Sequence, residues 1–345
     1  MPSRRLTLRD LARVAGVHYT TVSLALRNDP RLPAATRERL QALARERGYV
    51  PDPMVVSLAR YRSGLRPVEY QATLAWLTAF PTREAWRKVD IFREQHAGAE
   101  ARARELGYAL EPFWMTEPGM TPARASQILR TRNIAGLIVA PLPKAGGTLE
   151  LDWHQFPSVA IGYSLASPAF HLVCAHQYRC VRLALRELKA RNYRRIGLVM
   201  LRASDDRVDH NWLAGYLVEQ YEGASRQRLK PLLLPAWDAA AFHAWREAAR
   251  PDAIVTKLPQ ALPALRSAGV RIPEDLGLVL LSELHPGDHI AGVDENPRQV
   301  GAAAVDFVIG LRERHERGEP ALPQRLMIDG VWIEGETVRP RVQAP

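Results

Sequence analysis

Residues Ala15–Leu26, "AGVHYTTVSLAL", combine a glycine, a run of four hydrogen-bonding side chains at 18–21 and an apolar end. At the helical repeat of about 100° per residue, one face carries the residues expected to be buried: Val22, Ala25 and Leu26. Thr20, Ser23 and Leu24 then point away from the core. The pattern predicts a short helix whose polar, accessible side chains lie at its N-terminal end.

Two further short helices are predicted around this one. "LTLRDLARVAG" has Thr7 as an N-cap, Asp10 three residues later and Gly16 as a C-terminal stop. "AATRERLQALARERG" predicts a helix that begins after Pro33. Three helices with a tight glycine-containing turn between the first two describe a helix-turn-helix, in which the start of the second helix enters the DNA major groove.

The charge of the N-terminal segment supports DNA binding. Residues 1–66 hold 13 arginines, no lysine and five acids, a net charge of +8, whereas the whole chain carries +10. A basic module on a nearly neutral body is typical of a protein that binds a polyanion. An arginine-rich solvated surface is the alternative, because the chain has 42 arginines and only five lysines throughout.

Composition limits the other classes of function. No apolar run approaches membrane-spanning length, and the first residues lack the apolar core of a signal peptide. Cys174 and Cys180 are too few for a disulfide framework, and no Cys/His cluster has zinc-ligand spacing. We therefore expect a cytoplasmic protein, in a cell without a nucleus, that needs no metal and no cofactor.

After residue 66 strand-like and helix-like segments alternate. The first series includes "ATLAWLTAF" and "IAGLIVAPL", and a second runs from "HLVCA" to "LGLVLLSEL". Such alternation predicts parallel sheets covered on both faces, hence two α/β lobes. Ligands bind such folds at the carboxyl ends of the strands, so a cleft between the lobes is the expected ligand site.

Taken together, these segments resemble the LacI/GalR family of bacterial transcription regulators. The resemblance is most specific in the head, "LTLRDLARVAGVHYTTVSLALRNDPRLPAATRERLQALARERGYVPDP", and continues in "RELKARNYRRIGLVM", "IPEDLGLVLL" and "VDENPRQVGAAAVDFV". It implies an all-α helix-turn-helix head and an α/β body of two periplasmic-binding-protein-like lobes with parallel sheets. The implied segments are a head at 1–50, a hinge at 51–66 and an effector-binding and dimerisation body at 67–345, with lobe 1 at about 67–163 and 294–322 and lobe 2 at about 164–293 and 323–345.

The resemblance assigns roles in DNA binding. Tyr19, Thr20 and Leu24 occupy the positions that read base edges. Other residues match phosphate-contacting positions: Thr7, His18, Thr21, Ser23, Arg27, Arg31 and Thr36. Leu24 stands where several relatives have arginine, so contact with a thymine methyl group replaces a bidentate guanine contact. His18 and Pro33 stand where relatives carry a helix cap.

The hinge resemblance lies in "YVPDPMVVSLARYRSG". In the family this segment forms a short helix in the minor groove when operator is bound, and a leucine wedges into the central base step. Leu58 matches that wedge. A plain linker is the alternative interpretation of this segment.

The resemblance also predicts the floor of the effector cleft: Phe80, Lys144, Tyr163, Trp212, Lys257 and Glu283. Sugar-binding relatives carry arginine at the position of Trp212 and asparagine or aspartate at that of Lys257, which argues against a simple sugar. Trp212 would stack on a flat ligand face, or pack between lobes, and Lys257 favours an anionic ligand. The acidic turn "SDDRVDH" is expected to be a solvated loop.

We therefore expect an effector-controlled repressor that binds a pseudo-palindromic operator as a homodimer. The sequence has no leucine heptads that could form a tetramerising coiled coil. An enzyme with a DNA-binding head is one alternative, although no G-x-S-x-G elbow or glycine-rich phosphate loop is present. A ligand-binding protein of the same two-lobe fold is another.

Overall fold

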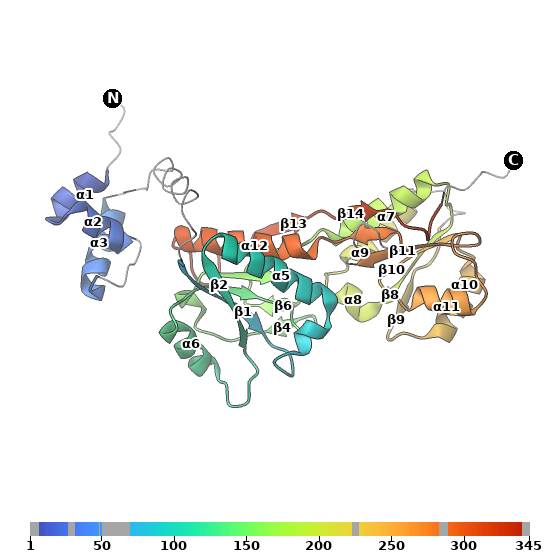
Figure 1. Cartoon of the computed structure of the whole chain (residues 1–345), viewed down its shortest axis with the longest axis horizontal. Helices are drawn as coiled ribbons and strands as arrows, with labels where there is room; N and C mark the ends of the chain where they lie inside the picture. The colour runs from blue at the N-terminus through green and yellow to red at the C-terminus, as the bar shows by residue number, and fades with distance from the viewer. Residues whose placement is uncertain are drawn as a thin grey trace, which may run out of the picture. The chain divides into compact units, whose positions relative to one another are not determined.

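The computed structural model describes residues 7–26, 32–47, 49, 70–222, 228–282 and 289–339. The chain divides into two compact units, residues 1–69 and 70–345. Figure 1 shows the elements of each unit. No helix in these described ranges is long and apolar enough to cross a membrane.

The first unit is a small helical head. Its described helices are α1 (Leu8–Ala15), α2 (Tyr19–Leu26) and α3 (Ala34–Glu46). Six buried side chains form their core, most of them at positions that the helical repeat predicts: Leu11, Ala12, Val22, Ala25, Leu40 and Ala44. Leu26, predicted to be buried, is only half-buried against this core.

The first lobe of the second unit is built on a six-stranded sheet of parallel pairs in the order β13-β7-β5-β3-β1-β2. The strands are β1 (Ala72–Thr78), β2 (Tyr108–Trp114), β3 (Ile134–Val139), β5 (Ser158–Ile161), β7 (His171–Ala175) and β13 (Arg325–Ile328). The helices are α5 (Asp90–Glu105), α6 (Pro122–Thr131) and α12 (Pro297–Glu313), with short 3-10 helices at Ala85–Lys88 and Trp153–Gln155. A separate pair, β4 (Gly147–Thr148) and β6 (Leu165–Ser167), completes the lobe.

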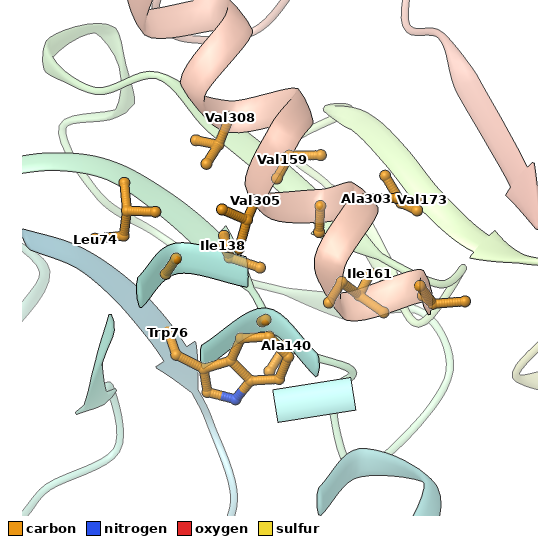
Figure 2. Packing of buried hydrophobic residues seen from close by; sticks show 14 of the residues in the cluster. Leu74, Trp76, Ile138, Ala140, Val159, Ile161, Val173, Ala303, Val305 and Val308 are labelled. Carbon is orange, nitrogen blue, oxygen red and sulfur yellow. The ribbon is translucent and has the colours of Figure 1, made fainter. Parts of the chain in front are cut away.

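Apolar side chains cover both faces of this sheet, as expected for parallel strands. Every residue of β1 is buried. Figure 2 shows α12 lying across one face, where Val305 and Val308 meet Leu74, Ile138 and other strand residues. On the other face, α6 contributes buried residues to a second cluster.

Two glycines allow α5 and α12 to pack closely. A Cβ atom on Gly98 would lie 2.0 Å from the carbonyl oxygen of Arg298, and one on Gly301 would lie 1.8 Å from that of Gln95. Side chains therefore cannot stand at this crossing without separating the helices. Arg298 and Glu94 add an ion pair across it, at 2.7 Å.

The second lobe repeats the architecture with the strand order β14-β12-β11-β10-β8-β9. The strands are β8 (Ile196–Leu201), β9 (Leu232–Leu234), β10 (Ala253–Thr256), β11 (Gly277–Ser282), β12 (Gly292–Asp294) and the antiparallel β14 (Val331–Ile333). The helices are α7 (Gln177–Ala190), α8 (Arg202–Asp206), α9 (Asn211–Glu222), α10 (Ala239–Ala249) and α11 (Ala261–Ser267). Helices α7 and α9 share one hydrophobic cluster, and α10 and α11 share another.

Three chain segments pass between the lobes, and two of the expected lobe boundaries are wrong. Strand β7, which we assigned to the second lobe, pairs with β5 in the first sheet. Strand β13, also assigned to the second lobe, pairs with β7. The crossings therefore follow β7, β12 and β13, near residues 176, 295 and 329.

Candidate DNA interface and effector site

The start of α1 is a closed capping box, as the sequence predicts. The Thr7 hydroxyl oxygen accepts a hydrogen bond from the Asp10 backbone N–H at 3.3 Å, and Asp10 accepts one from the Thr7 N–H at 3.0 Å. The helix ends at Gly16 in the left-handed region, with φ of 67°. This turn sets where α2 begins.

The N-terminal end of α2 presents polar side chains to solvent. Tyr19 and Thr20 are exposed, while Val22 and Ala25 on the opposite face are buried. His18 precedes the helix, and its Nδ1 lies 2.8 Å from the Thr20 hydroxyl.

An arginine lies close to the same end. The Arg9 guanidinium lies 5.9 Å from the centroid of the Tyr19 ring. Thr21, Ser23 and Leu24 are half-buried. Donors, acceptors and a cation therefore gather at one end of a helix whose other face anchors it to the head.

Helix α3 holds α2 in place. Gln41 donates a hydrogen bond to the Ala25 carbonyl at 2.8 Å, and Arg37 donates one to the Leu32 carbonyl at 2.7 Å. Pro33 precedes α3 and provides no side-chain cap. Thr36 lies half-buried in the first turn of that helix.

Four of the predicted site residues lie outside the described residues: Arg27, Arg31, Leu58 and Glu283. The whole of the predicted hinge, residues 51–66, also lies outside the described residues. Their roles stay predictions.

In the second lobe, a buried polar cluster stands at the carboxyl ends of β10 and β12. The Trp212 indole N–H donates a hydrogen bond to one oxygen of Glu295 at 2.9 Å, and Lys257 Nζ pairs with the other at 2.7 Å. Lys257 also donates to the Leu281 carbonyl, and its ammonium lies 4.4 Å from the centroid of the Trp212 ring. Only 1% of Glu295 and 4% of Trp212 are exposed.

This cluster changes the expected role of Lys257. We expected its charge to attract an anionic ligand, but Glu295 already neutralises it inside the protein. Trp212 is held by packing and by its hydrogen bond, which leaves little of the ring for stacking on a ligand. Trp212 and Lys257 lie together in a triad with Glu295, and their place in an effector site stays a prediction.

The acidic turn before α9 is also more than a solvated loop. Asp205 is buried, and its carboxylate accepts hydrogen bonds from the Leu213 backbone N–H at 3.1 Å and from His210 Nδ1, whose distance is 2.9 Å. The hydrogen bond that His210 donates to Asp205 is the main reason that the pKa of His210 is raised above its usual value. Asp209 and His210 both have positive φ, near 55°, so the backbone before α9 is strained.

The first-lobe residues of the predicted set are spread around the strand ends. Phe80, two residues after β1, is buried and packs edge-to-face against Phe92 with centroids 6.1 Å apart. Tyr163, just after β5, is half-buried, with its hydroxyl 3.6 Å from Cys174 Sγ, and burial raises its pKa. Lys144 is exposed.

One described contact joins the two lobes through a residue that we did not predict. The Arg207 guanidinium, at the end of α8 in the second lobe, lies 5.2 Å from the centroid of the Phe92 ring in the first. Nothing in the local sequence distinguished Arg207 from the other 41 arginines, and Glu295 was missed because it lies between a strand and a helix rather than after an apolar run. The acidic character of the "VDENP" segment was the available signal for Glu295.

Two cavities occur elsewhere in the described body, of about 440 Å³ beside Arg246 and Asp275 and about 340 Å³ beside His171 and Glu316. Neither cavity is lined by a residue of the predicted effector set. The described residues of the predicted effector set lie instead near the ends of the strands. The described residues contain no cluster of His, Cys, Asp and Glu able to hold a metal ion.

Comparison with known families matches both units. Residues 7–52 match the bacterial regulatory proteins of the lacI family, and residues 185–338 match the periplasmic binding protein-like domain. The head of the chain therefore matches the lacI family, and much of the body matches the periplasmic binding protein-like domain. The family match in the head covers α1, α2 and α3, the three helices that form the candidate DNA interface.

Relatives of known identity extend over almost the whole chain. The HTH-type transcriptional regulator PtxS of Pseudomonas putida is 27% identical over 321 residues, which cover 89% of each chain. The lactose operon repressor of Escherichia coli is 23% identical over 343 residues, 93% of this chain and 89% of the repressor. Both relatives are regulators of transcription.

A solved structure of the lac repressor dimer, bound to operator and the anti-inducer ONPF, shares the fold. It aligns with a TM-score of 0.54 and 18% identity, covering 97% of this chain and all of the other. At this identity the likeness supports the fold alone, and it agrees with a helical head and a two-lobed α/β body.

Proposed function

We propose that this chain is a sequence-specific DNA-binding transcription regulator, a repressor in the bacterial cytoplasm whose operator affinity a small molecule controls. The observation that carries the proposal is α2, whose exposed Tyr19 and Thr20 stand at the end that a helix-turn-helix inserts into the major groove. Base reading falls to Tyr19, Thr20 and Leu24. Thr7, His18, Thr21, Ser23 and Thr36, with Arg27 and Arg31, supply phosphate contacts.

The small molecule binds between the two lobes. Both sheets are largely parallel, and ligands of such folds bind beyond the carboxyl ends of the strands. Phe80 and Tyr163 follow strands of the first sheet, and Trp212 and Lys257 belong to the cluster at the strand ends of the second. A ligand held there touches both lobes and therefore favours one arrangement of the lobes over another.

The regulator acts as a homodimer on a pseudo-palindromic site. Three exposed apolar side chains support a second copy as the partner: Leu326 and Met327 on β13 and Val331 on β14, the end strands of the two sheets. Exposed apolar side chains on edge strands are commonly covered by a partner. The lac repressor, which has the same fold, forms a dimer on its operator.

Selection from random duplex DNA tests the proposal. The full chain should enrich one motif with two-fold symmetry, and light scattering of the free protein should give the mass of a dimer. Enrichment of no motif would contradict sequence-specific binding, and a stable tetramer would contradict the proposed assembly. Turnover of metabolites in a broad substrate screen, with no motif enriched, would favour the enzyme alternative.

A further inference from the structure

Arg207 occupies an unusual place between the lobes. It follows α8 and is half-buried, with its guanidinium over the Phe92 ring. Phe92 lies in the first turn of α5 and packs in turn against Phe80, a residue of the predicted effector set. Arg207 is thus a cation of the second lobe that contacts the Phe92–Phe80 aromatic pair of the first lobe through Phe92.

No described residue forms an ion pair or side-chain hydrogen bond with this guanidinium. The neighbouring acids are engaged elsewhere: Asp205 holds His210 and the N-terminus of α9, and Asp206 lies 3.7 Å from His210. Burial lowers the pKa of Arg207, and no carboxylate in the part of the chain that the structure describes opposes that effect.

Other arginines of the second lobe with little exposure are paired. The Arg182 side chain, 21% exposed, contacts Glu219 and Glu222, and that of Arg191, 16% exposed, contacts Glu187 and Glu334. Removing a charge from water without a partner is costly, so such groups are retained mainly where function uses them. Among the described residues, therefore, none supplies an anion to the Arg207 guanidinium.

We propose that Arg207 binds a carboxylate of the small-molecule effector. The planar guanidinium can hold a carboxylate through two parallel hydrogen bonds while its face rests on Phe92. A single carboxylate fits better than a phosphate dianion, because Glu295 neutralises Lys257 and acids flank Arg207 in the sequence. The inference rests on the proposed function, since it names the ligand class of the same interlobe site.

The test begins with stability, without any ligand. Arg207→Met keeps an unbranched side chain against Phe92 and removes the unpaired charge, so the melting temperature should stay the same or rise. Arg202→Met removes an exposed arginine from α8, the short helix that Arg207 follows, and is the matched control. A fall of several degrees for Arg207→Met alone would mean that Arg207 is structural, and would overturn the proposal.

Calorimetry on the full chain then measures binding of four sugar acids and their neutral counterparts. The acids are D-gluconate, D-galactonate, D-glucuronate and D-galacturonate; the counterparts are the matching alditols and aldoses, with D-glucose 6-phosphate as the phosphate probe. We expect an acid to bind the wild type and the Arg202→Met protein, and about 10- to 100-fold more weakly to Arg207→Met, the usual range for a charged hydrogen bond.

Binding of an acid with equal affinity to wild type and Arg207→Met overturns the proposal, as does binding of only neutral sugars or the phosphate, or of no acid at all. These measurements contain no DNA. A chain that binds an acid through Arg207 but enriches no DNA motif would therefore refute the proposed function and leave this inference standing.

Discussion

At the scale of single residues, Leu24 is the apolar member of an otherwise polar surface on α2. It is half-buried, so part of its side chain remains available at the proposed interface. An aliphatic side chain at a base-reading position contacts a thymine methyl group, whereas arginine forms two hydrogen bonds with guanine. The identity of this residue should therefore decide which base is preferred in each half-site.

Leu24→Arg should change the selected motif at one position of each half-site, with the changed base worth roughly 1–3 kcal/mol. Random-sequence selection with both proteins measures this. Ala42→Arg, on an exposed position of α3, adds the same charge elsewhere in the head and should leave the motif unchanged. An identical motif for wild type and Leu24→Arg would remove Leu24 from the base-reading set.

His210 should titrate above the ordinary histidine value of about 6.5, because Asp205 holds its protonated form. The protonated ring then stabilises the folded state fully below that value, and this contribution is lost as the pH rises through the folded pKa. Asp205→Asn should lower the pKa of His210 towards 6.5, while asparagine still caps α9. Imidazole NMR titration, with His210→Gln for assignment, would contradict this if the wild-type value is at or below 6.5.

Local pattern predicted the residues that act on their near neighbours. The Thr7–Asp10 box and the Gly16 stop are interactions within a few positions, so the sequence already contains both partners. The Trp212–Glu295 bond joins residues 83 positions apart, and the absence of a described carboxylate beside Arg207 is a property of the folded surroundings. Neither feature could be predicted from the local sequence. For this reason we expected the Lys257 ammonium to be available to a ligand, whereas it pairs with Glu295.

At the scale of elements, the α5–α12 crossing depends on two glycines that serve packing rather than backbone freedom. Gly98 and Gly301 both lie inside helices. Each faces a backbone carbonyl of the other helix so closely that a Cβ atom would overlap the carbonyl oxygen. Gly310, later in α12, faces only the end of the Arg314 side chain, at 3.1 Å. The same helix therefore supplies a test position and its control.

Gly301→Ala should destabilise the body by about 2–3 kcal/mol, because the helices must separate to admit the methyl group. Gly310→Ala should be neutral or stabilise by up to about 1 kcal/mol, since alanine favours a helix and Arg314 can move. Urea denaturation measures both free energies of unfolding. Equal effects of the two substitutions would show that the crossing does not limit helix packing.

Element type could be predicted from apolar periodicity, but strand partners could not. "HLVCA" reads as a buried strand in either lobe, and only the pairing of β7 with β5 assigns it to the first sheet. The same holds for β13, which pairs with β7 although about 150 residues separate them. Pairing between distant segments leaves no trace in the local pattern, so the lobe boundaries were the part of the fold that sequence analysis misplaced.

At the scale of the whole molecule, the ligand and the DNA act on different units of one chain. A ligand alters DNA affinity only if it binds two lobe arrangements unequally, because equal affinity shifts no population. Arg207 and Phe92, from different lobes, are described residues whose contact depends on that arrangement. In the proposed function, by contrast, sequence recognition belongs to α2, and this separation is the claim on which the function depends.

Fluorescence anisotropy at about 0.15 M salt tests that claim most directly, with the selected duplex and a scrambled duplex of equal length. The wild type should bind the selected duplex at least about 10³-fold more tightly than the scrambled one. Replacing Tyr19, Thr20 and Leu24 together by alanine keeps the buried Val22 and Ala25, so α2 should still fold. That variant should bind scrambled DNA as the wild type does and lose most of the preference. A triple variant that keeps the full preference, or a wild type that shows none, would contradict the account.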